Sequence, residues 1–363
     1  MSLAILGFGT AAPHQSITQQ EAAELAKAFS GLSRAETHRL STLYQRTEIQ
    51  TRGSVLLEAL DGSGPRQSFF PPAEDRTDRG PSTGQRMQRY AKEAAPLALA
   101  ASQRALLAAG LTGSQISHLV TVSCTGFVAP GVDIALMKAL KLAPTVSRTH
   151  VGFMGCHGAL NGLRVALALV HADPDARALL CAVELCSLHF YYGGNPEKAV
   201  ANALFADGAA ALVAGSAAQA PVSAWRLVAA GSYLFPDSED AMTWRIGDHG
   251  FEMTLSPRVP DLITNHLPSW LAAWLIQHGV TVPQVRSWAI HPGGPRILTA
   301  VASCLDLPPD ATTISREVLA ECGNMSSPTI LFILERLCHR AAPRPCVALA
   351  FGPGLSVEAA LLV

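Results

Sequence analysis

The chain has 363 residues, of which 49% are apolar and only 15% are charged, and its formal net charge at pH 7 is −1. This composition supports a large buried core and a subunit interface, and the scattered charge gives no electrostatic basis for nucleic-acid binding. No uninterrupted apolar run reaches about 18 residues, so the sequence indicates no membrane span.

Predicted strands and helices alternate through the first part of the chain. The start, MSLAILGFGTAAP, lacks the basic residues of a secretory signal and is typical of a first strand. Residues 58–88 are rich in Gly, Pro and charge, and predict a long surface excursion. The predicted elements are a strand at 3–10, helices at 16–29 and 90–110, a strand at 116–127, helices at 132–140 and 159–172, a strand at 176–187, and a turn and strand at 202–215.

The second part repeats the order of strand, turn and helix. Residues 215–225 are the best candidate for a boundary, which predicts an N-terminal half at 1–220 and a C-terminal half at 221–363. The predicted elements are a strand at 226–233, a loop at 235–250, a helix at 259–278, a strand at 285–290, turn–helix units at 291–305 and 323–340, and a strand, glycine turn and strand at 345–363. The alternation predicts an α/β protein, and the similar order of the halves is a weak internal repeat.

Eight cysteines are spread widely, and no CxxC pair occurs. Because the chain is long and apolar and shows no export signal, we expect reduced thiols in the cytoplasm rather than a disulfide framework. The spacing also gives no zinc motif, so no metal is expected.

Cys156 is the cysteine with the clearest chemical context. It lies in GFMGCHGAL, where glycines precede an apolar, helix-like stretch. A thiol at a helix N-terminus faces unpaired N–H groups and the positive end of the helix dipole, both of which favour the thiolate. The alternative is a buried, unreactive cysteine, because cysteine is among the most buried residue types.

Two further turns carry polar side chains that could meet Cys156. His291 ends a predicted strand before PGGP, and Asn324 lies in GNMSSP before a predicted helix. Alone, His291 could be a hydrogen-bonded structural residue and Asn324 a helix cap. Together the three residues predict acyl transfer: the thiolate attacks a thioester, and the imidazole and amide stabilise an enolate oxygen.

These motifs resemble the type III polyketide synthases of the chalcone and stilbene synthase superfamily. The matching stretches occur in the family's order and span nearly the whole chain: ILGFGTAAP, GCHGALNGLR, ALFADGAAALV, FPDSED, HPGGPRIL, GNMSSPTILFIL and FGPGLSVEAALL. The last turn reads AFGPGLS, with Ala350 in place of a glycine. The resemblance implies a thiolase-like fold of five layers, αβαβα, built from two similar halves.

The resemblance also implies roles for individual residues. Cys156 would carry the starter and the growing chain, His291 would form an ion pair with it, and Asn324 would assist decarboxylation. Phe205 would lie between the CoA tunnel and the cavity. The turn formed by Gly352, Pro353 and Gly354 would shape the cavity wall.

Several positions vary from the plant pattern or are harder to align. Met253 falls where plant members carry a second gatekeeper phenylalanine, unless the register is shifted and Phe251 fills that place. Ala129 replaces a methionine that reaches the partner's cavity. Cys124, where threonine is common, is either inert cavity wall or a residue that steers an intermediate.

The resemblance implies acyl-CoA and malonyl-CoA as substrates, no cofactor, and a homodimer. Arg46 and Arg52 lie where the family binds CoA phosphates, although a solvated helix face would explain them equally well. The smaller residues at 129 and 253 favour aliphatic starters and alkylpyrone or alkylresorcinol-type products. A pyrone or phenol would form when the extended chain cyclises. Malonyl and aromatic starters are the alternatives to an aliphatic one.

Three alternatives compete with this prediction. A ketoacyl-acyl-carrier-protein synthase that initiates fatty-acid synthesis has the same fold and also uses Cys, His and Asn. A hydroxymethylglutaryl-type synthase needs a catalytic glutamate, and no residue clearly fills that place. A decayed, non-enzymatic scaffold is disfavoured because Cys156, His291 and Asn324 are all present.

Overall fold

The structure is a computed structural model that describes residues 2–58 and 67–363. Its main feature is a nine-stranded mixed sheet with the order β11-β12-β13-β8-β1-β7-β6-β4-β5. The strands of this sheet are β1 Leu3–Ala11, β4 His118–Ser123, β5 Ser147–Gly152, β6 Ala178–Leu185, β7 Asp207–Ser216, β8 Arg226–Leu234, β11 Ser287–Ile290, β12 Cys346–Gly352 and β13 Ser356–Leu362. The junction between β1 and β8 pairs only Leu3 with Leu227 and Ala4 with Arg226, so the sheet has two parts.

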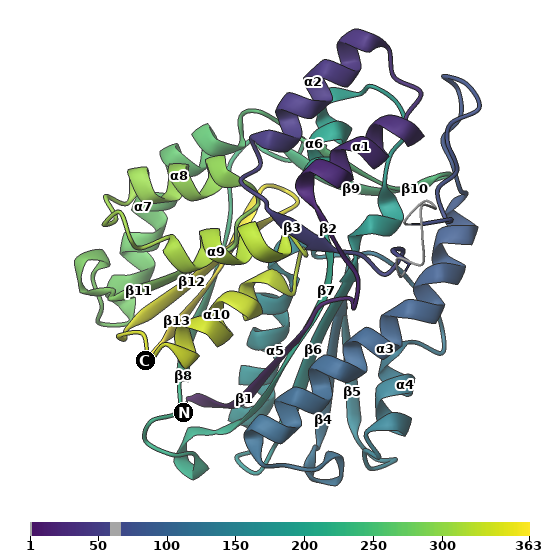
Figure 1. Cartoon of the computed structure of the whole chain (residues 1–363). Coiled ribbons are helices and arrows are strands. Elements are labelled where there is room, and N and C mark those ends of the chain that lie inside the picture. The colour runs from purple at the N-terminus through teal and green to yellow at the C-terminus, as the bar shows by residue number, and fades with distance from the viewer. Residues whose placement is uncertain (1, 59–66) are drawn as a thin grey trace.

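Helices pack on both outer faces and between the two parts of the sheet, which gives five layers (Figure 1). The helices α3 Thr83–Ala109 and α4 Val132–Ala139 lie on one outside, and α7 Val259–Gln277 and α8 Pro295–Cys304 lie on the other. The central layer contains α5 Gly158–Ala172 and α10 Thr329–His339, whose apolar side chains share one core with both parts of the sheet. Because β6 and β7 lie in the middle of the sheet, every one of their residues is buried.

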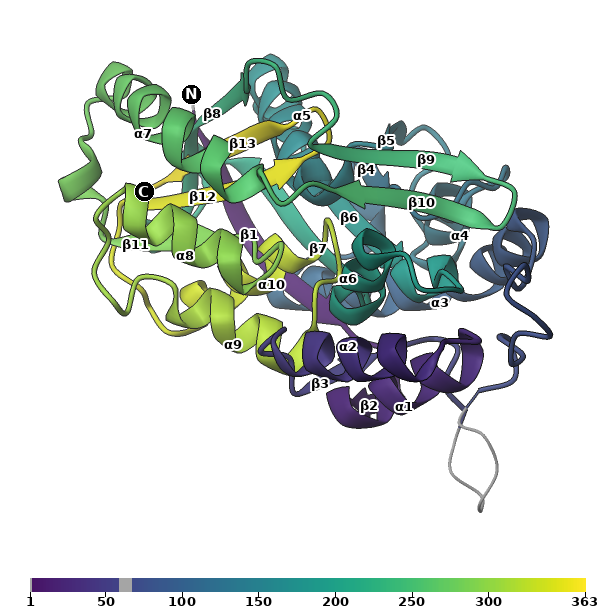
Figure 2. The same ribbon diagram turned by 90° about the horizontal axis from the view of Figure 1, so that it is seen from above.

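A cap of smaller elements lies at one end of the layers, as Figure 2 shows from above. It contains α1 Gln19–Phe29, α2 Arg34–Gln45, α6 Pro196–Leu204, the hairpin of β9 Met242–Gly247 and β10 Gly250–Leu255, and the pair β2 Ser16–Thr18 and β3 Thr51–Gly53, with α9 Thr313–Cys322 beside it. Local sequence explains where α1, α2 and α3 begin. Thr18, Ser33 and Ser82 each form a capping box with the Glu or Gln three residues later.

The alternating α/β order and the thiolase-like layers predicted from the sequence are confirmed, and some elements differ. The sequence prediction omitted α2, α6 and α9, and treated residues 235–250 as a loop where the β9–β10 hairpin forms. The helix predicted at 90–110 begins earlier, at Thr83, so α3 includes the end of the predicted surface excursion. Residues 59–66 of that excursion lie outside the described part of the chain.

Candidate active site

Cys156 lies in a short 3-10 turn, Gly155–His157, between β5 and α5. Gly155 has a φ of +71°, and a Cβ at this position would lie 2.5 Å from the Pro353 ring. Glycine is therefore required for the turn to approach the β12–β13 loop. The thiol precedes the N-terminus of α5, where the helix dipole favours negative charge.

Two side chains from the segment before α10 contact the Cys156 sulfur. Ser326 Oγ lies 3.6 Å from Sγ, and the Asn324 side chain also hydrogen-bonds to it. Asn324 is held on both sides: its backbone N donates to Leu204 O at 2.9 Å, and its Oδ1 accepts from Ser326 N at 2.8 Å. Ser326 has a φ of +57°, a left-handed conformation that is uncommon for a serine. That backbone directs its hydroxyl toward the thiol.

His291 follows β11 and is the third of the predicted reactive residues. Its backbone N donates to Leu349 O at 2.8 Å, and its side chain is only 1% exposed. Neither ring nitrogen has a hydrogen-bond partner within residues 2–58 and 67–363. An imidazole buried in this way without partners is costly and is unusual outside a reactive site. His291 is close to His157, the residue after Cys156, and positive charge on His157 would lower the pKa of the His291 ring.

Burial shifts the pKa values of both reactive groups toward their neutral forms. It raises the pKa of the Cys156 thiol to about 12, although hydrogen bonds from Ser326 and Asn324 act in the opposite direction. Burial also lowers the pKa of His291 to about 3. Desolvation therefore opposes the thiolate and imidazolium expected from the sequence, whereas the hydrogen bonds to the sulfur favour the thiolate, and the ion pair stays a prediction.

Cys124 belongs to a polar cluster beside the nucleophile. Its sulfur lies 3.7 Å from Ser326 Oγ and 3.2 Å from Glu184 Oε1, and its backbone N donates to Glu184 at 2.9 Å. Glu184 is fully buried and also accepts hydrogen bonds from Thr125 and Ser327. Burial raises the pKa of Glu184, and it raises that of Cys124 well above its ordinary value. Cys124 is therefore a weaker nucleophile than an ordinary thiol.

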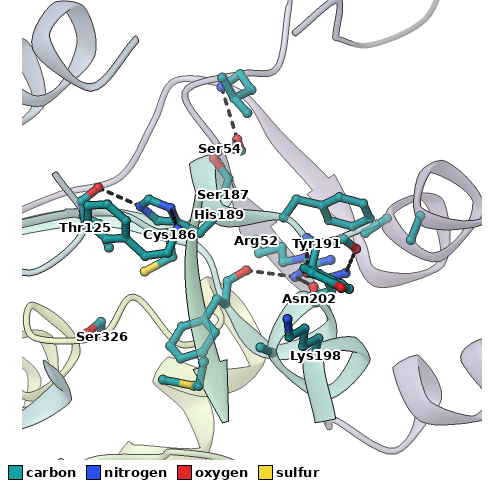
Figure 3. Close-up of a pocket in the computed structure, with 18 of the residues that line it drawn as sticks. Arg52, Ser54, Thr125, Cys186, Ser187, His189, Tyr191, Lys198, Asn202 and Ser326 are labelled. Carbon is teal, nitrogen blue, oxygen red and sulfur yellow. Dashed lines mark hydrogen bonds between the residues drawn. The ribbon is translucent and has the colours of Figure 1, made fainter. Parts of the chain in front are cut away.

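A large cavity opens beside Cys156 and extends toward the cap (Figure 3). The empty space between its walls, including the part open to solvent, is about 1230 Å³. Thr125, Cys186 and Ser326 lie toward one end of the cavity, and Tyr191, Lys198 and Asn202 toward the other. Cys124, Phe205, Phe251, Met253 and Pro353 also line it.

One wall of the cavity is a rigid group of His189, Trp244 and Phe251. The His189 ring stacks on the Phe251 ring at a centroid distance of 4.3 Å. The Trp244 ring packs edge-on against the His189 ring at a centroid distance of 5.4 Å. Trp244 Nε1 donates to Cys124 O at 2.7 Å. The N–H of Phe251 donates to His189 Nδ1, so the ring proton is on Nε2, which donates to Thr125 O. His189 therefore acts as a wall and has no free nitrogen for acid–base chemistry.

The remaining residues predicted from the sequence fall into two groups. Phe205, Phe251, Met253 and Pro353 line the cavity, so both alternatives for the gatekeeper position face it. Gly352 and Gly354 are not in the lining. A Cβ on Gly352 would lie 2.3 Å from the His157 ring, so this glycine allows close packing behind Cys156. Ala129, which precedes a cis proline, is exposed outside the cavity.

The two arginines predicted to bind CoA phosphates have different surroundings. Arg52 is 9% exposed and donates from Nη1 to Asn202 O at 2.6 Å and to Phe205 O at 2.8 Å. Its guanidinium also lies over the Tyr44 ring. Arg52 therefore contacts the end of α6 through one guanidinium nitrogen and also lines the cavity, and its binding of a CoA phosphate stays a prediction. Arg46 is exposed and does not line the cavity.

Several site residues were missed by the sequence analysis. Ser326 lies inside a quoted motif, and its position next to the predicted Asn324 was the available signal. Glu184, His189 and Trp244 stand in apolar or unremarkable stretches, whereas His157 directly follows Cys156 in a quoted motif. The roles of all four follow only from contacts between distant segments. His157 bridges Asn161 and Ser356 directly behind the nucleophile.

Residues 2–58 and 67–363 contain no cluster of His, Cys, Asp and Glu suited to a metal ion. None of their helices is both long and apolar enough to cross a membrane.

Comparison with known proteins gives matches along the whole chain. Residues 2–218 match the family model for the N-terminal domain of chalcone and stilbene synthases, and residues 226–363 match that for the C-terminal domain. The alpha-pyrone synthesis polyketide synthase-like Pks18 of Mycobacterium tuberculosis is 34% identical, over 98% of this chain and 90% of its own. The 1,3,6,8-tetrahydroxynaphthalene synthase of Streptomyces peucetius is 41% identical, over 73% of this chain and 72% of its own.

A solved structure has the same fold. The crystal structure of PKS-I from the brown alga Ectocarpus siliculosus superposes with a TM-score of 0.92 and is 33% identical, covering 99% of this chain and 98% of the other.

Proposed function

The chain belongs to the chalcone and stilbene synthase family of type III polyketide synthases, and we propose that Cys156, His291 and Asn324 are its catalytic residues. Enzymes of this family are acyltransferases that catalyse decarboxylative Claisen condensation. The ketoacyl-acyl-carrier-protein synthase alternative is not favoured, because the models that match both parts of the chain are those of chalcone and stilbene synthases. The proposal concerns which residues act, on which substrates, and toward which product.

The observation that carries the proposal is the environment of the Cys156 sulfur. The thiol faces a cavity and receives a hydrogen bond from Asn324. His291 interacts electrostatically with His157, the residue after Cys156, and both its ring nitrogens are buried without a partner among the described residues. We propose that the His291 imidazole acts as general base for the Cys156 thiol, so that the proton moves when the substrate arrives.

In the loading step, Cys156 Sγ attacks the carbonyl carbon of an acyl-CoA starter. His291 takes the thiol proton, the bond between the carbonyl carbon and the CoA sulfur breaks, and CoA leaves as its thiol after receiving that proton. The product is an acyl thioester on Cys156. Because burial raises the pKa of the Cys156 thiol, attack at neutral pH requires a base that takes its proton, and we assign that role to His291.

In the extension step, malonyl-CoA loses CO2, and the electron pair of the broken carbon–carbon bond forms the enolate of acetyl-CoA. The Asn324 amide and an N–H of His291 donate to the enolate oxygen. The enolate carbon attacks the acyl group on Cys156, and the released thiolate regains a proton. Repetition of these steps lengthens the chain, which then cyclises to a pyrone or a resorcinol or phenol.

We propose that the starter is an aliphatic acyl-CoA and that the product is an alkylpyrone or alkylresorcinol. The apolar lining of the cavity supports an aliphatic starter. The alpha-pyrone activity in the name of the relative Pks18 supports a pyrone product. Acyl-CoA and malonyl-CoA would be the only reactants, and no cofactor is needed for these steps.

The proposed division into halves at 1–220 and 221–363 is supported by the narrow β1–β8 junction. We also propose a homodimer in the cytoplasm. Exposed apolar side chains near the cavity support an interface: Phe127 is 43% exposed, Val128 40% and Met154 38%. Phe127 packs on the cavity residue Phe251, so a partner at this surface would adjoin the active site.

The roles of the three residues can be separated with radiolabelled malonyl-CoA. Asn324→Ala and His291→Ala should lose most CO2 release, whereas Cys156→Ala should keep it and lose all condensation with an acyl-CoA. Cys304→Ser, which changes a thiol on α8 outside the cavity, is the control. Wild-type CO2 release by both Asn324→Ala and His291→Ala would contradict the assigned roles.

A further inference from the structure

His157, the residue after Cys156, is buried at a position where its helix makes no use of the side chain. It occupies the N-cap of α5, but the side chain accepts no hydrogen bond from the first turn of that helix. Side chains that cap helices are usually those of Ser, Thr, Asp or Asn. Only 2% of His157 is exposed. Because a buried polar ring costs free energy unless its nitrogens are hydrogen-bonded, the partners of His157 indicate what this side chain does.

Both ring nitrogens of His157 have partners, and these come from different segments. Nδ1 lies 2.7 Å from Asn161 Oδ1, on the next turn of α5, and Nε2 lies 2.9 Å from Ser356 Oγ, at the start of β13. An amide oxygen only accepts, so Nδ1 carries the proton of the neutral ring and Nε2 can accept from the Ser356 hydroxyl. Ser356 Oγ is also 3.0 Å from Pro353 O. The chain of contacts from Asn161 through His157 to Ser356 is called the His157 bridge below.

The His157 bridge crosses a tight contact between the turn of the nucleophile and the β12–β13 loop. A Cβ on Gly352 would lie 2.3 Å from the His157 ring, and a Cβ on Gly155 would lie 2.5 Å from the Pro353 ring. The two glycines thus let the segments touch. An apolar ring of similar size would fill the same space, so the imidazole differs from it through its two hydrogen bonds. These bonds set the direction of the contact as well as its distance.

The other two reactive residues are held by different segments. The backbone N of Asn324 donates to Leu204 O, and that of His291 donates to Leu349 O, each at a distance between 2.8 and 2.9 Å. Cys156, by contrast, directly precedes His157 in a 3-10 turn of three residues. Loss of a bond in the His157 bridge should therefore displace the Cys156 sulfur more than it displaces the amide or the imidazole.

We propose that His157 is a positioning residue, which through Asn161 and Ser356 holds its turn so that the Cys156 sulfur is aligned with the carbonyl carbon of the acyl-CoA. This inference rests on the proposed function, because it assumes that Cys156 becomes acylated. A misplacement of about 1 Å at a reacting group can lower a rate by about 100-fold. The His157 bridge should thus matter for steps in which the sulfur takes part, and not for the decarboxylation that Asn324 and His291 promote.

The test measures two reactions of the full-length enzyme separately. Acylation of Cys156 by hexanoyl-CoA and by lauroyl-CoA, followed in a single turnover as the mass of the acyl-enzyme, requires the sulfur. Release of CO2 from radiolabelled malonyl-CoA alone does not. Ser356→Ala and Asn161→Ala should each lower the acylation rate constant by about tenfold or more and leave CO2 release within about twofold of the wild type. Ser356→Thr, which keeps the hydroxyl, should restore acylation to within about twofold. Ser269→Ala, at an exposed position on α7, is the control.

A double substitution tests whether Ser356 acts through the imidazole. His157→Phe removes both ring nitrogens and keeps a flat ring in the same place. In this variant, Ser356→Ala should change the acylation rate constant by less than about twofold, because the bond that it removes is already absent. A further loss of about tenfold would mean that Ser356 acts through Pro353 O alone, which would overturn the role of His157.

The outcomes separate this inference from the function beneath it. Equal losses of acylation and CO2 release in Ser356→Ala and Asn161→Ala would mean that the His157 bridge only stabilises the fold, and wild-type acylation in both would mean that it positions nothing. Either result overturns the inference and leaves the proposed function intact. If the wild type is acylated by neither thioester and releases no CO2, the proposed function fails and the inference fails with it. The single variants of Ser356 and Asn161 decide the question even where His157→Phe does not fold.

Discussion

His189 is expected to make the folded state sensitive to acid, and this effect can be isolated by one substitution. The ring is buried and both nitrogens are used, since Nδ1 accepts from Phe251 N at 2.8 Å and Nε2 donates to Thr125 O at 2.7 Å. Protonation would require Nδ1 to give up its acceptor role and would place a charge among aromatic rings. Burial accordingly lowers the pKa of His189 from 6.5 to about 3.

The sign and size of the effect follow from proton linkage. Because the pKa is lower in the folded state than in the unfolded state, the unfolded chain binds more protons between these two values. The stability contribution of the neutral ring is complete above pH 6.5 and is lost as the pH falls toward 3. Between about pH 7.5 and about pH 5, this one group should cost the folded state about 2 kcal/mol.

The assay compares urea unfolding of the wild type and His189→Gln at these two pH values. Glutamine retains a donor for Thr125 O but does not titrate, so the wild type should lose about 2 kcal/mol more than the variant on acidification. Other buried groups, including His157, His291, Glu184 and Asp207, are present in both proteins and cancel in the difference. His38→Gln, at an exposed position, is the control. Parallel losses in the wild type and His189→Gln would refute the reasoning.

Two further predictions concern the nucleophile and the packing behind it. Because the pKa of Cys156 is raised, the rate of its alkylation by iodoacetamide should increase steadily with pH from about pH 6 to about pH 9, without a plateau. Peptide mass mapping measures this rate. A rate that does not depend on pH in this range would instead indicate a pre-formed ion pair with His291. Gly352→Ala should cost about 1–3 kcal/mol and most of the activity, because its Cβ would lie 2.3 Å from the His157 ring. Gly110 has a φ of +64°, and a Cβ added there would have no atom within 4 Å. Gly110→Ala should therefore lower the free energy of unfolding by about 1–2 kcal/mol through backbone strain and leave kcat unchanged. Equal kcat in these two variants would contradict a role for the packing between Gly352 and His157.

Much of the fold could be predicted because its signals are local. The alternating strands and helices follow from apolar periodicity, and the start of α1 follows from the Thr18 and Glu21 capping box. The same signal was available for α2, where Ser33 and Glu36 form another box, although that helix was not predicted. The β9–β10 hairpin was missed because its sequence, with Asp248 and Gly250 at the turn, is polar enough to resemble a loop.

The candidate site was only partly predictable for a physical reason. Turn motifs specify that Cys156, His291 and Asn324 lie at the ends of elements, since glycine, proline and capping residues act within a few positions. Desolvation depends on every atom packed around a group, so the pKa shifts of Cys156 and His291 could not be read from the motifs. Arg52 is the clearest case: its motif predicted a phosphate ligand, whereas the contacts of its Nη1 with carbonyls about 150 residues away depend on the tertiary fold.

The sequence by itself determined the order of strands and helices, the turns that carry the reactive side chains, and the family to which the chain belongs. Those properties depend on residues that are close together along the chain. The tertiary structure alone decided which side chains meet Cys156, how strongly burial shifts the pKa of each buried group, and which residues line the cavity. These depend on the packing of distant segments against one another, which excludes water and sets the local dielectric environment.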